Sequence, residues 1–342
     1  MSIELLSLTA FAITRISAGV GFRLGLRDHP NERKQHRGSI PLTGGLAVFI
    51  TLLIGTVMLD APVYTPQMLA IATFIFIVGV FDDVRHISPA TRLLVQFVSG
   101  FALATYGGIT LYNVGDLLAV GDISLLWLGA PLTALSVAGL CNAYNMIDGI
   151  DGLAASVTAL PLLVLYLLAL QAGHPMADFL LLMLTPLAVF LLFNLGPNNR
   201  FLPRIFLGDG GSVTLGFLVA ASLIYFSQEQ NAIIEPVTAL WLVTVPLMDM
   251  LATMLRRHRK GRHLMEADRS HLHHSLMDLG LGPRQTLTAM VSWAVICASV
   301  GLALEAIPAY MSLCCYLAVF ALHCTLVVRS ESIGKRLNIQ FR

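Results

Sequence analysis

Eleven apolar runs divide this chain and leave few folds open to it. A helix of roughly 17–25 apolar residues crosses a bilayer, and most of the runs have about this length. Two of them are short, and we expect their helices to continue into the adjoining polar residues. Only 12% of the residues are charged, against about 25% in soluble proteins. The sequence therefore predicts an all-α, polytopic integral membrane protein with about eleven transmembrane helices. The runs are 3–22, 40–59, 67–81, 93–112, 123–141, 153–171, 178–195, 212–227, 236–255, 287–304 and 309–328.

Basic residues mark every second loop. Of the 21 Lys and Arg residues, all but Arg15 lie in alternate loops or in the C-terminal tail. Positively charged loops remain cytoplasmic, so we expect an odd number of spans, a periplasmic N-terminus and a cytoplasmic C-terminus. Residues 1–342 would then form one transmembrane domain. Its cytoplasmic segments are 23–40, 82–92, 142–152, 196–212 and 256–286.

Other global features add little. The five cysteines lie in apolar runs without metal-ligand spacing, which indicates neither disulfides nor zinc. The net charge is only +1, and we expect no nucleic-acid partner.

Acidic side chains end the third run at Asp82 and Asp83. Adjacent carboxylates at a membrane edge are costly unless a cation or water satisfies them. Neighbours on a helix point about 100° apart, so two separate tasks are favoured over one shared ion. A solvated helix end is the alternative. Arg85 and Arg92 follow on the same loop. They could bind phosphate oxygens, or they could simply be the positive charges that hold this loop on the cytoplasmic side.

Two glycine-rich motifs follow. In NAYNMIDGIDGL, Asn142 and Asn145 supply amides of the kind that read a nucleobase or sugar, and each of Asp148 and Asp151 precedes a glycine. Asp151 could instead cap the next helix. In FLGDGGS, Asp209 precedes the eighth run. The Gly-rich turn would present free N–H groups to an anion and Asp209 to Mg²⁺; an ordinary helix cap is the alternative.

The last cytoplasmic loop is basic and rich in histidine. Its first cluster, residues 256–260, suits lipid headgroups. The later Arg269, His271, His273 and His274 suit hydrogen bonds to a diphosphate, which we favour over zinc. Within the ninth run, Pro246 predicts a kink. Asp249 is a candidate intramembrane acid, although we favour a structural role for it.

Taken in this order, the motifs resemble those of the polyprenyl-phosphate N-acetylhexosamine-1-phosphate transferases (glycosyltransferase family 4). The resemblance extends from DHPNERKQHRGSIPLTGG (Asp28 to Gly45) through DDVRHISPATRLLVQ and the motifs above to the histidine loop. EPVTALW, VPLMDM and DRSHLHH favour the branch that uses UDP-GlcNAc. The chain departs from the family at His86, where an acid is common.

The resemblance implies a reaction and roles for individual residues. GlcNAc-1-phosphate would pass from UDP-GlcNAc to undecaprenyl phosphate, giving UMP and undecaprenyl-diphospho-GlcNAc, as the first membrane step of O-antigen or common-antigen synthesis. Mg²⁺, or Mn²⁺ in its place, would be held by Asp209 and Asp82. Asp83 would orient the acceptor or take its last proton. The further candidate contacts to the donor are Arg85, Arg92, Asn142, Asn145, Asp148, Asp151, Arg269, His271, His273 and His274.

Several alternatives stay open at this point. The donor could be UDP-GalNAc, a UDP-6-deoxy-HexNAc or UDP-MurNAc-pentapeptide. A transporter would need charges near mid-membrane and often repeat symmetry, whereas here the polar groups collect on one face and no repeat appears. We expect the bacterial inner membrane, contacts with membrane lipids, an active site facing the cytoplasm and, as a further option, a homodimer.

Overall fold

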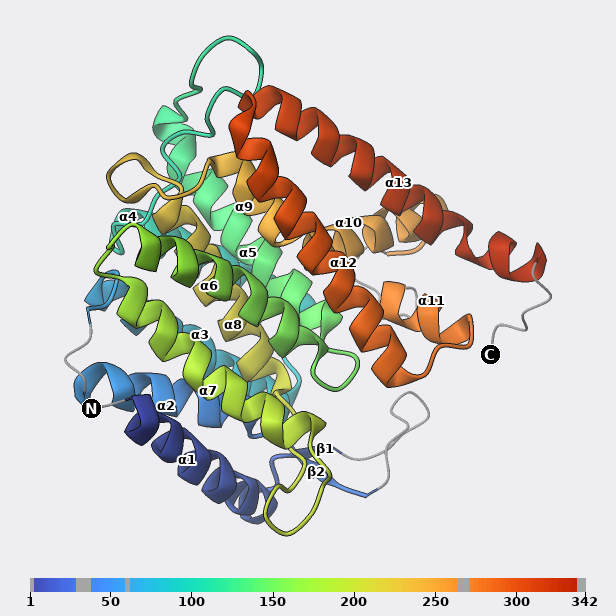
Figure 1. The fold of residues 1–342 in the computed structure, drawn as a ribbon. Helices are drawn as coiled ribbons and strands as arrows, with labels where there is room; N and C mark the ends of the chain where they lie inside the picture. Colours follow the sequence, from blue (N-terminus) through green and yellow to red (C-terminus); the bar gives the residue numbers. More distant parts are fainter. Residues whose placement is uncertain (1–2, 29–37, 59–61, 264–270, 337–342) are drawn as a thin grey trace.

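The computed structural model describes residues 3–28, 38–58, 62–263 and 271–336 as a bundle of helices (Figure 1). The helices differ in tilt, and several cross one another at steep angles. The α-helices are α1 (Ile3–Leu24), α2 (Gly44–Met58), α3 (Pro66–Arg85), α4 (Pro89–Thr105), α5 (Gly129–Ile147), α6 (Leu153–Gln171), α7 (Ala177–Leu195), α8 (Gly208–Phe226), α9 (Pro236–Leu242), α10 (Thr244–Arg259), α11 (Leu272–Asp278), α12 (Pro283–Ala303) and α13 (Ala309–Arg336). Short 3₁₀ turns are η1 (Leu126–Leu128), η2 (Glu229–Asn231) and η3 (Leu304–Ala306).

Every predicted apolar run contains an α-helix, but the run at 93–112 is helical only to Thr105 and the runs are not equivalent. In the described part of the chain, eight helices are long and apolar enough to cross a membrane, which makes this a multi-pass membrane protein. The bent pair α9 and α10 adds up to one more, and α2 is a shorter apolar helix. The number of crossings and the side of each terminus stay predictions. α3 and α8 extend beyond their apolar runs into the polar motifs, as expected.

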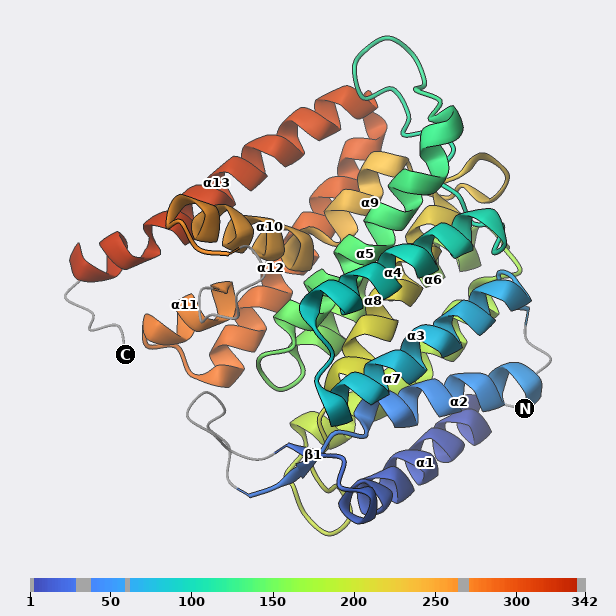
Figure 2. The same cartoon turned by 180° about the vertical axis from the view of Figure 1, so that it is seen from behind.

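Helix α8 lies at the centre and is buried along almost its whole length. Glycines let its neighbours approach closely. A Cβ on Gly45 of α2 would collide with the backbone of Gly211, and one on Gly79 of α3 with the backbone of Gly210. Small residues at helix contacts are how membrane helices gain packing energy. Figure 2 shows α3, α4 and α5 on the face opposite to that of Figure 1. Gly210 and Gly211 of FLGDGGS therefore serve helix packing, and the turn predicted there is wrong at these two residues.

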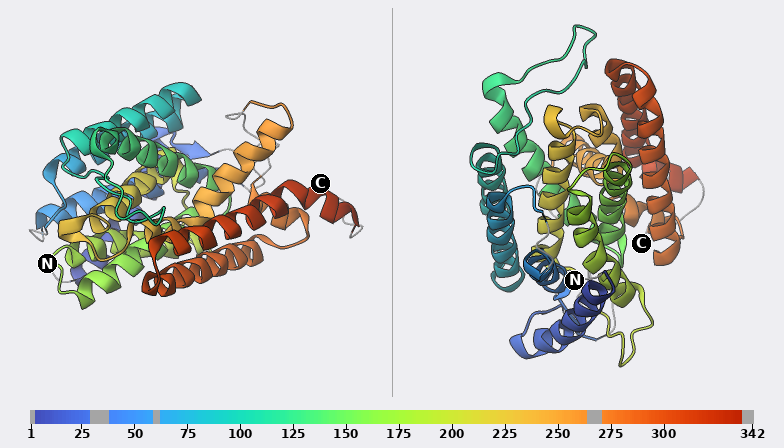
Figure 3. Two further views of the ribbon diagram at one scale, coloured as in Figure 1. Left: turned by 90° about the horizontal axis from the view of Figure 1, so that it is seen from above. Right: turned by 60° about the vertical axis from the view of Figure 1, so that its left-hand side comes forward.

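The ninth run is broken. α9 and α10 meet at an angle of 78°, and the break falls at Val243, before Pro246. Pro246 lies in the first turn of α10, where a missing backbone N–H costs nothing. The kink was thus predicted correctly, but a few residues late. Figure 3 shows the C-terminal helices, in orange and red, on one side of the bundle and α1 on another.

The bundle has two distinct ends. A short antiparallel pair, β1 (Arg27–Asp28) with β2 (Ile40–Pro41), lies at the end towards which α11 also lies (Figure 1). The loop bridged at Asn113 and Ser124 lies at the other end.

A small acidic group occupies the end with the bridged loop. There the Glu235 N–H donates to Glu305 Oε1 at 3.0 Å. Burial, followed by the charges of Glu305 and Asp122, raises the pKa of Glu235.

Candidate active site

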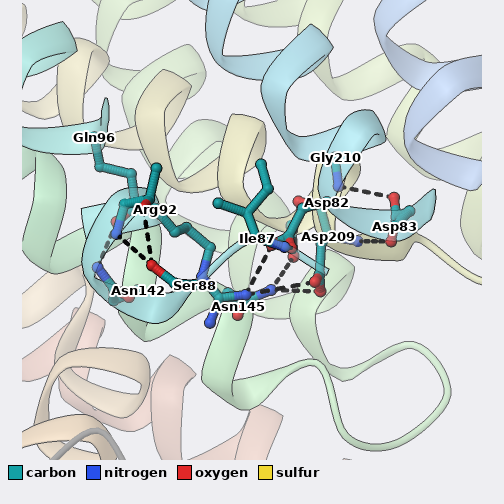
Figure 4. A network of polar contacts seen from close by, with 12 residues as sticks. Asp82, Asp83, Ile87, Ser88, Arg92, Gln96, Asn142, Asn145, Asp209 and Gly210 are labelled. Atoms are coloured by element: carbon teal, nitrogen blue, oxygen red, sulfur yellow. Dashed lines mark hydrogen bonds and ion pairs between the residues drawn. The ribbon is translucent and has the colours of Figure 1, made fainter. Parts of the chain in front are cut away.

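The Asp83 carboxylate at the end of α3 contacts the backbone at the start of α8, where Asp209 lies (Figure 4). Asp83, in the last turn of α3, accepts hydrogen bonds from the backbone N–H groups of Asp209 (2.8 Å) and Gly210 (3.1 Å). A helix N-terminus favours an anion, and here that anion is the Asp83 carboxylate. The prediction that these two N–H groups would be free for a phosphate is therefore wrong. Asp209 belongs to the first turn of α8 and is not its N-cap, which is Leu207.

Gly208 makes this meeting sterically feasible. Its φ of +78° lies in the left-handed region, which favours glycine. A Cβ at this position would also stand 2.8 Å from the Asp83 carboxylate. The glycine before Asp209 therefore allows α3 to place a carboxylate against α8.

Asp82 has a different environment. Its side chain is 4% exposed, and its Oδ2 lies 3.0 Å from Arg92 Nη1. Its Oδ1 accepts from the Ile87 N–H at 2.7 Å. Arg92 Nη1 also lies 3.5 Å from Asp209 Oδ2, so one guanidinium joins both carboxylates. Because Asp82 is almost fully buried and already paired with the Arg92 cation, the geometry supports Asp82 as a group that holds the α3–α4 turn, in place of the metal ligand that the resemblance implied.

Asn145, on α5, orients Asp209. Its Nδ2 donates to Asp209 Oδ1 at 2.8 Å and to Ser212 Oγ at 3.1 Å. The Asp209 side chain is nevertheless 40% exposed, so Asp209 remains accessible to a ligand. Asn145 thus acts on the carboxylate, whereas the sequence predicted a direct contact with the donor.

The other asparagine of α5 faces α4. Asn142 Nδ2 donates to Gln96 Oε1 and to the Ala138 carbonyl oxygen. We call the set Asp82, Asp83, Arg92, Gln96, Asn142, Asn145 and Asp209 the polar network. It joins α3, α4, α5 and α8 at one end of the bundle (Figure 4).

The DG motif between α5 and α6 contacts the loop before α8. Asp151 Oδ2 lies 3.3 Å from Arg204 Nη1, and Asp148 is exposed just after α5. The N-cap of α6 is Gly152, so Asp151 is not the helix cap considered as an alternative. Arg204 had no signal in the sequence beyond its positive charge.

Asp249 holds the histidine motif. It is 1% exposed, and its two oxygens accept from His271 Nδ1 (2.9 Å) and from the Leu272 N–H (2.7 Å). Because a carboxylate can only accept, the proton of His271 lies on Nδ1, leaving Nε2 free of that proton. Asp249 therefore has a structural role, as the sequence favoured. It orients the segment that carries the candidate catalytic histidines.

The histidine motif lies against the DG motif. The rings of His271 and His273 stack with centroids 5.7 Å apart, and those of His273 and His274 lie 4.2 Å apart. A Cβ on Gly149 would collide with the His273 imidazole. Because Gly149 has no side chain, the His273 ring can pack against it. The two motifs, more than a hundred residues apart in the sequence, are therefore in contact.

Some predicted residues lie outside this arrangement. Arg269 and residues 29–37 of the first cytoplasmic segment fall outside the described residues. Arg85 is exposed at the end of α3 and takes no part in the polar network. His86, where the family commonly has an acid, adopts a left-handed conformation with φ of 52° and is the C-cap of α3.

One histidine had been overlooked. His323 of α13 is 6% exposed and lies within the electrostatic influence of Asp249. A lone polar residue in the last apolar run was the available signal.

The donor set is compatible with Mg²⁺. The part of the chain that the structure describes contains no group of three or more His, Cys, Asp or Glu side chains able to hold a metal ion. Mg²⁺ does not require one, because it is commonly bound by one or two carboxylates together with substrate phosphates. Asp83 and Asp209 suit that requirement, because the Asp83 carboxylate accepts from the Asp209 and Gly210 N–H groups and so lies beside Asp209.

Comparison with known proteins agrees with this geometry. The profile of "Glycosyl transferase family 4" matches residues 65–227, the segment that carries the whole polar network. A protein of Yersinia pestis is 33% identical over 98% of this chain and 93% of its own length, and one of Escherichia coli O157:H7 is 33% identical over 92% and 87%. A Haemophilus influenzae protein is 32% identical over 88% and 86%. All three are named undecaprenyl-phosphate alpha-N-acetylglucosaminyl 1-phosphate transferase. The chain belongs to glycosyl transferase family 4 and is an enzyme of the transferase class.

Proposed function

We propose that this enzyme transfers GlcNAc-1-phosphate from UDP-GlcNAc to undecaprenyl phosphate. An oxygen of the acceptor phosphate attacks the phosphorus that bears the sugar, and the bond to the UMP phosphate breaks. The products are undecaprenyl-diphospho-GlcNAc and UMP. The names of the relatives, which are 32–33% identical over most of the chain, support both the donor sugar and the acceptor.

The observation that carries the proposal is the meeting of Asp83 and Asp209 at the start of α8. Two carboxylates at this point, one of them 40% exposed, suit a divalent cation that also binds a diphosphate. When bound, Mg²⁺ would neutralise charge that develops on the diphosphate as the bond to UMP breaks. Asp209 and Asp83 would hold it.

Asp83 is also positioned to orient the acceptor. Its two backbone hydrogen bonds fix the carboxylate, so little reorganisation is needed during the reaction. A phosphate monoester has a second pKa of about 6, and the acceptor is therefore largely dianionic at neutral pH. A strong general base is not required, and we assign orientation to Asp83 ahead of proton removal.

The histidine motif completes the charge balance. With Nδ1 of His271 donating to Asp249, the protonated imidazole would present its Nε2–H group to a diphosphate oxygen. His273 and His274 lie beside it, and Arg92 brings a positive charge to within 3.5 Å of Asp209. These groups would bind the diphosphate, which carries several negative charges.

The distribution of charge supports the location. Most Lys and Arg residues of the chain lie in loops that contribute to the site, which favours the cytoplasmic face of the bacterial inner membrane. UDP-sugars are supplied from that side. The acceptor tail would lie among the apolar helices, near the break between α9 and α10.

A single assay tests the proposal. Purified protein would be incubated with undecaprenyl phosphate, Mg²⁺ and, in parallel, UDP-GlcNAc, UDP-GalNAc, a UDP-6-deoxy-HexNAc and UDP-MurNAc-pentapeptide. We expect UMP and a lipid-linked sugar with UDP-GlcNAc, and loss of both in Asp209→Asn. Preference for another donor would refute the sugar assignment. UMP release without a lipid product would refute the reaction.

A further inference from the structure

A buried amide on α4 controls how Asn142 is presented. Gln96 lies one turn beyond Arg92 on the same face of α4 and is 1% exposed. Its Oε1 accepts a hydrogen bond from Asn142 Nδ2 across the α4–α5 contact. Asn142 is half-buried near the C-terminal end of α5, one helical turn from the residue that orients Asp209.

The orientation of the Asn142 amide follows from its other partner. The Ala138 carbonyl oxygen lies 2.8 Å from the Asn142 amide, and a carbonyl oxygen can only accept. The atom that faces it must therefore be Nδ2, whose second N–H then points to Gln96. Both N–H groups of Asn142 are used within the protein. Among the described residues, none donates to its Oδ1.

Gln96 gains little stability from this arrangement. Because its Oε1 faces Asn142, its Nε2 is turned away, and in the described part of the chain this buried nitrogen has no hydrogen-bond partner. Burying an N–H group without a partner is unfavourable. That cost offsets the one hydrogen bond that Gln96 does make, so a methionine of similar length would fill the same space at little loss.

We propose that Gln96 is a positioning residue for the donor substrate. It holds Asn142 so that Oδ1 alone is presented, as an acceptor for an N–H or O–H group of the nucleotide sugar. The uracil imide, a ribose or sugar hydroxyl and the acetamido N–H are donors of this kind. The inference rests on the proposed function, because it assigns a contact within the same site.

Three variants and one control test this role. Gln96→Met removes the acceptor and keeps the length, Asn142→Ala removes the amide, and the double variant removes both. Ser99→Ala is the matched control: Ser99 lies one turn further along α4, is 2% exposed, and its buried hydroxyl likewise has no partner among the described residues.

The expected result is a change in donor affinity without a change in fold. We expect Gln96→Met to raise the KM for UDP-GlcNAc about two- to tenfold, the effect of one hydrogen bond. The kcat and the KM for undecaprenyl phosphate should stay within about twofold, since a group that contributes equally to substrate and transition-state binding changes KM alone. The Tm should match that of Ser99→Ala. The double variant should resemble Asn142→Ala, because both changes remove the same contact.

Three outcomes would overturn the inference. These are an unchanged donor KM in Gln96→Met, additive effects in the double variant, and a Tm clearly below that of Ser99→Ala, which would make Gln96 a structural residue. Failure of the proposed function is recognised separately, because the unaltered enzyme would then release no UMP from UDP-GlcNAc.

Discussion

Replacing Asp82 with asparagine distinguishes a metal ligand from a structural carboxylate. The substitution is nearly isosteric and removes one negative charge. In the structure, Asp82 accepts from the Ile87 N–H at 2.7 Å and pairs with Arg92 at 3.0 Å. The oxygen of the asparagine side chain could keep one of these two contacts. Its NH₂ group would then face the other partner, the Ile87 N–H or the Arg92 guanidinium, and two donors cannot form a hydrogen bond.

The magnitude follows from the burial of the pair. Breaking a fully buried ion pair costs about 3–5 kcal/mol, whereas exposed pairs contribute about 0–1 kcal/mol. Asp82 is 4% exposed but Arg92 is 25% exposed, and Arg92 retains Asp209 as a second partner. We therefore expect a loss of about 1–3 kcal/mol in the free energy of unfolding. The Mg²⁺ concentration for half-maximal activity should stay within about twofold of that of the unaltered enzyme, because the Asp82 carboxylate is buried and its charge is already balanced by Arg92.

The assay compares two variants of one motif. Asp82→Asn and Asp83→Asn would be purified in the same detergent, and thermal unfolding and UMP release against Mg²⁺ would be measured for both. Asp82→Asn should lower the Tm and leave the Mg²⁺ requirement unchanged, while Asp83→Asn should act on activity and on the Mg²⁺ requirement. A several-fold increase in the Mg²⁺ requirement of Asp82→Asn at an unchanged Tm would refute this reasoning and restore Asp82 as a ligand.

Three more predictions concern positions away from the carboxylate pair. Asp249→Asn should lower kcat roughly 10- to 100-fold at modest loss of stability. The amide would remove the charged hydrogen bond to His271 Nδ1 and would favour the tautomer with the proton on Nε2. An unchanged kcat would show that the protonation of His271 does not matter for the reaction. Gly79→Ala should cost about 1–3 kcal/mol by overpacking, since its Cβ would meet the backbone of α8, whereas Gly139→Ala, where no atom lies within 4 Å, should be neutral when Tm values are compared. The raised pKa of Glu235 means that its contribution to stability is present at pH values below its ordinary pKa and is lost as pH rises through the raised value. Glu235→Gln should therefore reduce the fall in Tm as pH rises through the raised pKa of Glu235. A curve of Tm against pH identical to that of the unaltered enzyme would contradict the raised pKa.

Much of the site could be predicted because its residues are conspicuous in an apolar chain. An aspartate, asparagine or histidine beside a run of apolar residues is costly unless it has a partner or a ligand. That cost singled out Asp83, Asn145, Asp209 and the histidine motif. The same argument identified Asp249 within a span, although it could not name His271 as its partner.

Partners and packing could not be predicted in this way. Gln96 lies within an apolar run and Arg204 in a polar loop, and nothing near either of them in the sequence indicates Asn142 or Asp151 as its partner. The glycines of FLGDGGS were interpreted as a phosphate-binding turn, because a Gly-rich segment before a helix commonly has that role. Only the approach of Gly79 to Gly210 and of Gly45 to Gly211 reveals that two of them serve helix contacts.

The sequence by itself determined the membrane class, the helices and the set of polar motifs, because hydropathy and charge are properties of each segment alone. The tertiary structure decided which of the paired carboxylates meets Asp209. Asp82 and Asp83 are neighbours on one helix and point in different directions, so one turns into the α3–α4 turn and the other towards α8. That choice depends on how closely α3 and α8 pack through their glycines, a contact between segments about 130 residues apart that no local pattern encodes.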